Sequence, residues 1–437
     1  MIRFALTMVA MLGVSAPVFA AVDIEEVTTP GGITAWLVEE DSVPFAALEL
    51  RFLGGGALDR DGKRGAINLM TATLEEGAGD LDAQGFAIAR DELAASFSFD
   101  VNRDSLTVSA RFLTENRDEA MALLKLALTE PRFDDAAIER VREQILSGLR
   151  SDQNDPNTIA GQTLNALIYG DHPYATSLDG TLESVAALTR DDVVNAYGDV
   201  IVKDRVFVGA TGDISAAELS TLLDELLGDL PSGGPPLPTT IDVATTGGIT
   251  VETLNVPQSV ALFGHSGIPR DDPDFFAAFV ANEVFGGSGL SSRLSQEVRE
   301  ERGLTYGIGS YMVNFDHAHL MLGQFATSND RVAEAIEVVL DEWGKIAADG
   351  VTEEELETAK TYLTGAYPLR FDSNAAIARI LVGMQLDGLP IDYIETRNGK
   401  VEAVTLDDVK RVVKRLYRPD ELRFVVVGQP EGLEGVN

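Results

Sequence analysis

The sequence predicts an α+β protein built from two homologous halves, and three observations support this fold class. The segment LTRDDVVNAYGDVIVKDRVFVGATGD is matched by VTLDDVKRVVKRLYRPDELRFVVVGQP, which places Thr189 and Thr405 at equivalent positions 216 residues apart. A proline- and glycine-rich stretch, LPSGGPPLPTT, lies between the two copies and has the composition of a linker. Within each half, strands and helices are partly segregated along the chain, which favours α+β over a doubly wound sheet.

The first 20 residues have the pattern of a secretory signal rather than of a folded element. Arg3 precedes an apolar stretch, and the small residues Val18 and Ala20 precede an expected cleavage after Ala20. The apolar stretch is short for a membrane span. We therefore expect residues 1–20 to be a signal peptide and the mature chain to be secreted across the inner membrane into the periplasm.

The rest of the chain divides into a first half, 21–229, a linker, 230–247, and a second half, 248–437. Further matched pairs support the duplication: FLTENRDEAMALLKLAL resembles FATSNDRVAEAIEVVLDEW, and LELRFLGGGALD resembles ALFGHSGIPRDD. Each copy of the T-x-D-D-V segment predicts a threonine-capped helix, a turn and a buried strand that ends in Val-Gly. A linker of this composition would allow the two halves to open and close.

The composition limits the classes of partner. The chain has 437 residues, of which 45% are apolar, so it can bury sizeable cores. Its net charge is −36, from 34 basic and 70 acidic residues. This charge argues against nucleic-acid binding and against docking on anionic lipid. A hydrated acidic surface that keeps the chain soluble is the simplest explanation of the charge.

The most informative motif is GGSGLSSRLSQEVREERGLTYGIGSY, residues 286–311. Leu290, Leu294 and Val298 fall at i, i+4 and i+8, which predicts a helix with one apolar face. Gly303 suits a left-handed helix stop, and a strand is expected to follow it.

Arg299 lies in the last turn of this predicted helix, and Tyr306 follows seven residues later, early in the predicted strand. Both side chains donate hydrogen bonds and together could hold a peptide carbonyl or a developing oxyanion. The alternative is structural, because a helix C-terminus favours arginine and a strand tyrosine is ordinary core or interface material.

The string R-E-E-R-G-L-T-Y, after a G-L-S-S-R-L helix start, resembles the C-terminal half-signature of the pitrilysin/insulinase family of zinc peptidases, which includes the mitochondrial processing peptidases. The similarity extends more weakly over nearly the whole chain after residue 21. It implies two roll-like halves that face each other across a cavity, with Arg299 and Tyr306 contacting substrate near the scissile bond. Gly286, Gly287 and Gly289 would let a peptide backbone approach, although tight-turn geometry also explains glycine there.

The same family carries an H-x-x-E-H zinc motif in its N-terminal half, and the matching positions here are Asn68, Thr71 and Ala72. A carboxamide, a hydroxyl and a methyl group cannot hold Zn²⁺ or activate its water. Glu139 and Glu143 lie near the expected place of the family's distant glutamate ligand, but we expect them to be solvated helix residues. No metal is therefore expected on this chain.

The four histidines give no clear metal site elsewhere in the chain. His317 and His319 stand two apart in the strand-like run HAHLMLGQF, which would place them on one face. A third ligand is not apparent, so an exposed or hydrogen-bonded pair is favoured over a metal centre. His172 lies in a turn-like segment without a partner motif.

Together with the missing zinc motif, the family resemblance implies a zinc-less partner subunit of a heterodimeric zinc metallopeptidase, inactive alone. The partner chain, a paralogue, would hold the zinc, and Arg299 and Tyr306 would act in trans on the peptide bound there. The alternative is a catalytically inactive structural or peptide-binding homologue, as the core subunits of a respiratory complex are. A metal-independent hydrolase has little support, because the chain has no G-x-S-x-G elbow and no cysteine.

Overall fold

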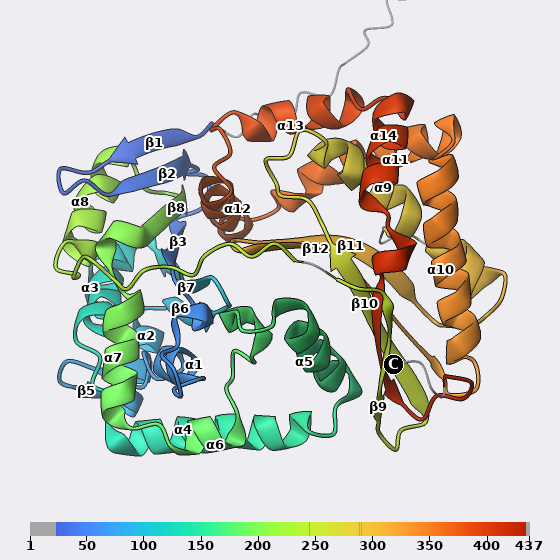
Figure 1. The fold of residues 1–437 in the computed structure, drawn as a ribbon. Coiled ribbons are helices and arrows are strands. Elements are labelled where there is room, and N and C mark those ends of the chain that lie inside the picture. Colours follow the sequence, from blue (N-terminus) through green and yellow to red (C-terminus); the bar gives the residue numbers. More distant parts are fainter. Residues whose placement is uncertain (1–22, 244, 288, 290, 434–437) are drawn as a thin grey trace, which may run out of the picture.

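The computed structural model describes residues 23–243, 245–287, 289 and 291–433 (Figure 1). The predicted signal segment lies outside these residues. The α+β class is confirmed, with one large β-sheet on each side of the linker. Within the described residues, no helix combines the length and the apolar character that a membrane crossing requires.

The first sheet has six strands in the order β1-β2-β8-β3-β7-β6. Strands β2 and β8 are parallel and the other neighbours antiparallel. Helices on one face of the sheet bury the main apolar core of this half. The strands are β1 (Glu25–Thr28), β2 (Thr34–Glu39), β3 (Phe45–Leu53), β6 (Ser96–Val101), β7 (Ser105–Leu113) and β8 (Val206–Gly212), with a small pair formed by β4 (Gly77–Ala78) and β5 (Leu81–Asp82). The helices are α1 (Ala66–Thr71), α2 (Ala83–Glu92), α3 (Arg117–Thr129), α4 (Asp135–Asp152), α6 (Leu182–Ala186), α7 (Arg190–Val200) and α8 (Ala216–Leu227).

The second sheet has five strands in the order β11-β12-β10-β13-β9, with only β13 and β9 parallel. Its core surrounds the fully buried Trp343, whose Nε1–H donates to Nε2 of His265 at 3.1 Å. Burial lowers the pKa of His265 to about 4, so the neutral imidazole accepts this bond. The strands are β9 (Gly248–Thr253), β10 (Gln258–Ser266), β11 (Ile308–Phe315), β12 (Ala318–Ser328) and β13 (Arg423–Gly428). The helices are α9 (Phe275–Gly286), α10 (Val332–Asp349), α11 (Glu353–Ala366), α13 (Tyr393–Glu402) and α14 (Leu406–Leu416).

The matched T-x-D-D-V segments fold alike. Thr189 caps α7 and Thr405 caps α14, each in a reciprocal capping box with the aspartate three residues later. Each helix is followed by a strand, β8 or β13, that lies inside its sheet. The predicted sequence of capped helix, turn and buried strand is confirmed in both copies.

The two halves exchange one helix each. Helix α5 (Pro156–Tyr169) belongs to the first half but packs on β10 and β13 of the second sheet. Helix α12 (Asn374–Leu386) belongs to the second half but packs on β8, β3 and β2 of the first sheet. Figure 1 shows α12 beside the first sheet and α5 beside the second. A Cβ on Gly209 of β8 would stand 2.4 Å from a carbonyl oxygen of α12, so glycine permits this close approach.

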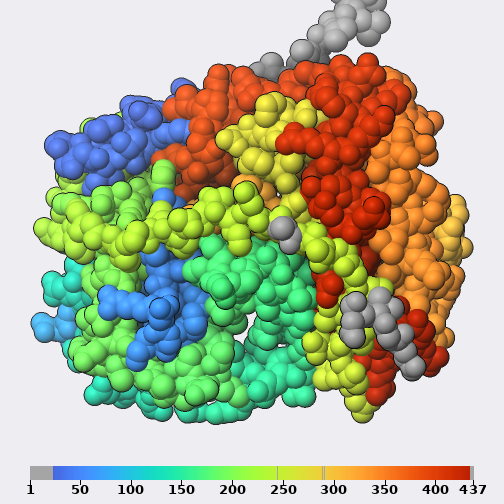
Figure 2. Space-filling view, in the orientation of Figure 1, coloured from blue at the N-terminus to red at the C-terminus, as the bar shows by residue number. Residues whose placement is uncertain are grey.

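The linker crosses between the halves as a band that runs above α5 in the view of Figure 2. Its described residues between 231 and 247 form neither helix nor strand. The backbone N–H of Ile241 donates to the carbonyl of His317 at 2.9 Å, and the carbonyl of Thr239 lies 3.1 Å from Nε2 of His172. The linker is therefore hydrogen-bonded to both halves, although its composition is that of a flexible segment.

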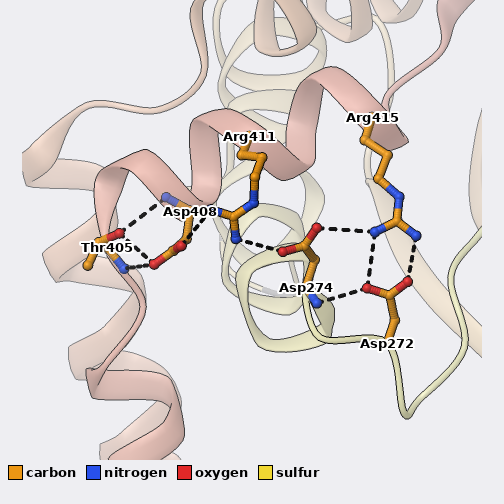
Figure 3. Close-up of polar contacts among 6 residues, drawn as sticks. All are labelled: Asp272, Asp274, Thr405, Asp408, Arg411 and Arg415. Carbon is orange, nitrogen blue, oxygen red and sulfur yellow. Dashed lines mark hydrogen bonds and ion pairs between the residues drawn. The ribbon is translucent and has the colours of Figure 1, made fainter.

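A network of ion pairs between arginines and aspartates holds α14 against the start of α9 (Figure 3). Arg411 binds Asp274 at 2.7 Å, and Arg415 binds Asp272 at 2.5 Å and Asp274 at 3.1 Å. The hydrogen bond from Arg415 lowers the pKa of Asp272 below its ordinary value. Because α9 ends in the glycine turn of the predicted site, this network helps to fix the position of that turn.

Candidate functional site

The predicted site residues converge on a cavity of about 630 Å³ at the free edge of the second sheet. We call it the Arg299 cavity. The glycine turn after α9, the segment that carries Arg299, the start of β11 and the first turn of α5 line its wall. Lining residues include Gly286, Gly287, Gly289, Arg299, Gly307 and Asn157. The structure therefore brings together four of the residues predicted from the motif.

Arg299 lies in a short π-helix, η5 (Ser295–Glu300), where the sequence predicted an α-helix. The wider turn is visible in the N–H of Glu301, which donates to the carbonyl of Gln296 five residues earlier. Leu294 and Val298 are fully buried, as the apolar face predicted; position 290 lies outside the described residues. Single π-turns occur frequently at functional sites, because they re-aim a side chain within a helix.

The end of this helix follows the prediction, and Arg299 remains partly accessible. Gly303 has φ +58°, the left-handed stop expected there. The Arg299 side chain is 35% exposed and pairs with Glu300 at 3.4 Å, an interaction on the surface of its own helix. A surface pair of this kind contributes little stability.

Tyr306 is not in a strand, and that prediction is wrong. Strand β11 begins two residues later, at Ile308. The hydroxyl of Thr305 accepts from the N–H of Gly307 at 3.2 Å and donates to the carbonyl of Ala326 at 2.7 Å, which holds a turn in place of strand pairing. Tyr306 projects from this turn with 88% of its surface exposed, next to Gly307 of the cavity wall.

Packing accounts for two of the three glycines. A Cβ on Gly286 would lie 2.6 Å from the backbone nitrogen of Ser310 in β11, and one on Gly287 would lie 2.7 Å from the backbone carbonyl oxygen of Glu283. At Gly289 the nearest atom is the hydroxyl oxygen of Ser291, at 3.4 Å. Close packing of the turn thus requires glycine at 286 and 287, whatever binds in the cavity.

The positions of the zinc motif serve the fold. The side-chain amide of Asn68 donates to Asp179 at 2.9 Å, and the buried hydroxyl of Thr71 donates to the carbonyl of Ile67 at 2.8 Å. Ala72 follows the last residue of the six-residue helix α1. The residues at this place do not fit a zinc ion, because none of the three carries an imidazole or a carboxylate.

The other metal candidates give no ligand set. Glu139 and Glu143 pair with arginines of their own helix, α4, as expected for solvated residues. His317 lies in the turn before β12 and His319 within that strand, so the prediction that both stand in one strand is wrong. The ring of His317 packs 6.3 Å from that of His172. The described residues contain no group of three potential ligands that could hold a metal ion.

A second cavity, of about 590 Å³, lies between the halves, where the family resemblance implied one, although its lining residues were not predicted. We call it the inter-half cavity. The turn between β6 and β7, helix α5, the turn between β11 and β12, and α12 contribute to its wall. Arg103 stacks over the rings of Tyr169 and Tyr174, and burial raises the pKa of Asp316 to about 6, helped by the charge of Asp104. Helix α5 borders this cavity and, through Asn157, the Arg299 cavity.

The described structure is thus an α+β fold of two halves with open cavities along its sheets, and its zinc-motif positions carry no metal ligands. Residues 187–363 match the family model described as "Peptidase M16 inactive domain". This match and the relatives below support the resemblance to the zinc-peptidase family that the sequence motifs indicated, and the matched model describes an inactive domain.

Relatives match along nearly the whole chain. The "Non-peptidase homolog YmxG" of Helicobacter pylori is 27% identical, over 89% of this chain and 90% of its own. The "Probable mitochondrial-processing peptidase subunit beta" of Schizosaccharomyces pombe is 23% identical, over 94% and 93%. A crystal structure described as a peptidase M16 inactive domain from Pseudomonas fluorescens superimposes with a TM-score of 0.87 at 26% identity, over 94% of this chain and all of the other.

Proposed function

We propose that this chain is the zinc-less partner subunit of a heterodimeric metallopeptidase and completes its peptide-binding chamber. One observation carries the proposal: the Arg299 cavity is open, with Tyr306 exposed beside it, although the zinc-motif positions of the same chain hold no ligands. A side chain that served only the fold would not need 88% of its surface exposed, as Tyr306 has. Both donors are instead available to a peptide bound against a second chain.

The role of each residue follows from its chemistry. The Arg299 guanidinium presents several N–H donors in a fixed fork, which suits a peptide carbonyl or a carboxylate. The Tyr306 phenol donates a single hydrogen bond from a short turn next to the cavity. Placed on the carbonyl that is attacked, these donors would stabilise the negative charge that develops on its oxygen. The zinc of the partner subunit would supply the Lewis acid and the activated water.

A second candidate function is that of a structural or peptide-binding homologue without any role in catalysis. The relative from Helicobacter pylori favours it, because that protein is named a non-peptidase homologue. In this case the cavities would hold a peptide or a neighbouring subunit, and Arg299 and Tyr306 would contribute affinity alone.

We expect the purified chain to bind no stoichiometric zinc and to hydrolyse no peptide, because Asn68, Thr71 and Ala72 cannot form the site. Adding a zinc-bearing paralogue from the same host should produce peptidase activity above that of the paralogue alone. Elemental analysis and a peptide-cleavage assay measure the two results. One tightly held Zn²⁺ per isolated chain would refute the first, and an unchanged activity of the paralogue would favour the structural candidate.

We also propose that the chain works in the periplasm after cleavage behind Ala20. Arg3, the apolar stretch and the small residues before Ala20 support export. Intact-mass measurement of the protein from its native host should give a mature chain that begins at Ala21. A mass that includes Met1 would contradict this proposal.

A further inference from the structure

A third cavity, of about 460 Å³, lies over the polar face of the first sheet and is bordered by α12. We call it the arginine cavity, after Arg51, Arg111 and Arg379 in its wall. Its floor is formed by β3, β7 and β6, whose side chains alternate between the apolar core and this face. Helix α12 covers β8, β3 and β2, and the polar side chains of β7 and β6 remain at the cavity.

The strand register fixes where the charges lie. Three rows of side chains cross this face, each with one residue from β6, β7 and β3. The rows are Ser96, Arg111 and Ala47; Ser98, Ser109 and Glu49; and Asp100, Thr107 and Arg51. Arg111 and Asp100 therefore stand two rows apart, about 13 Å along the strands. Arg379 reaches the cavity from α12, and its charge acts on Glu49 in the middle row.

The carboxylate of Glu49 already has its partners. It is 3% exposed, accepts a hydrogen bond from Ser109 at 2.5 Å and lies 3.5 Å from Arg51. Burial, the largest influence, nevertheless raises the pKa of Glu49. The short-range partners of Glu49 are therefore Arg51 and Ser109, while Arg379 acts on it only at longer range. Asp100 stands too far from Arg111 to pair with it.

Arg111 and Arg379 belong to a small group of arginines without a short-range partner in the described residues. Among the arginines of the described residues, only Arg111, Arg370 and Arg379 make no hydrogen bond, ion pair or contact with an aromatic ring. Two of these three line the arginine cavity. In a chain with 70 acidic and 34 basic residues, two unpaired guanidinium groups in one cavity form a local site for negative charge.

We propose that the arginine cavity binds the acidic side chains of an extended peptide, with Arg111 and Arg379 as the carboxylate receptors. The planar fork of a guanidinium group matches a carboxylate with two parallel hydrogen bonds. Arg51 lines both this cavity and the inter-half cavity, so the two cavities adjoin at this residue. The proposal rests on the peptide-binding function above and adds the class of peptide. The acidic surface elsewhere would repel such a peptide and direct it to this cavity.

The test uses two fluorescein-labelled decapeptides that differ only in three glutamates replaced by glutamines. Fluorescence anisotropy measures their Kd for the full mature chain at about 150 mM salt, where long-range repulsion is screened. We expect the glutamate peptide to bind about 5–10-fold more tightly, as two partly exposed ion pairs would allow. The double variant Arg111→Gln/Arg379→Gln should lose this preference. Arg370→Gln, which removes the third unpaired arginine from outside the cavity, should keep it.

Each other outcome overturns the inference, and the outcomes separate it from the proposed function. Equal binding of the two peptides to the wild-type chain, or an unchanged preference in the double variant, would refute the acidic class while peptide binding stands. If neither peptide binds, the peptide-binding function fails and the inference fails with it. Equal thermal midpoints of wild type and variants would show that lost preference does not come from unfolding.

Discussion

Replacing Tyr306 by phenylalanine should lower kcat of the reconstituted heterodimer by about 10²–10³-fold, the usual loss for one oxyanion donor. The change removes a single hydroxyl group and almost no volume. Because the side chain is 88% exposed, the free energy of unfolding should stay the same. The measurement is kcat of the complex together with the thermal midpoint of the isolated subunit.

Arg299→Lys provides the companion variant. It keeps the positive charge but loses the fork, so it should also impair catalysis without unfolding the chain. Tyr362→Phe is the matched control, since Tyr362 is a half-exposed tyrosine on α11 outside the lining of the Arg299 cavity. A Tyr306→Phe complex with wild-type kcat would leave only the structural role for this residue.

Replacing Leu381 by alanine should destabilise the whole chain by about 2–5 kcal/mol, the range for a fully buried leucine. Leu381 belongs to α12 of the second half, yet it packs on Trp36 and Val38 of the first sheet. The exchanged helix should therefore transmit the loss to both halves. Trp36 and Trp343, the two tryptophans of the chain, report on the first and the second half.

Urea unfolding followed in single-tryptophan variants measures the effect, with the two midpoints expected to shift together. Leu369→Ala is the matched control, because Leu369 is 76% exposed and its loss should change stability by less than about 0.5 kcal/mol. A shift of the Trp36 midpoint alone would mean that the halves unfold independently in spite of the exchanged helices.

Local sequence patterns predicted much of the fold. The duplicated T-x-D-D-V segments indicated capped helices because a capping box needs residues only three apart, and Thr189 and Thr405 both form one. The stop at Gly303 is equally local. Tyr306 was misplaced because the turn before β11 depends on Thr305 bonding to Ala326, a contact between residues far apart in sequence.

The arginine cavity and the helix exchange could not be predicted in the same way. Arg51, Arg111 and Arg379 come from distant parts of the chain and meet only after α12 packs on the first sheet. One signal was present: polar residues alternate in SFSFDV and in SARFL, which indicates strands with one polar face. The same pattern is typical of a solvent-facing sheet, so it could not identify the helix that borders this one.

The exchange of α12 also means that the first sheet cannot be fully covered until the second half of the chain has been synthesised. The last strand of the first sheet ends at Gly212, but the helix that covers Trp36 and Val38 begins only at Asn374. At 5–20 residues per second, roughly 10–30 s separate the synthesis of these segments. Until α12 is available, the first sheet keeps an apolar strip around Trp36 and Val38 uncovered.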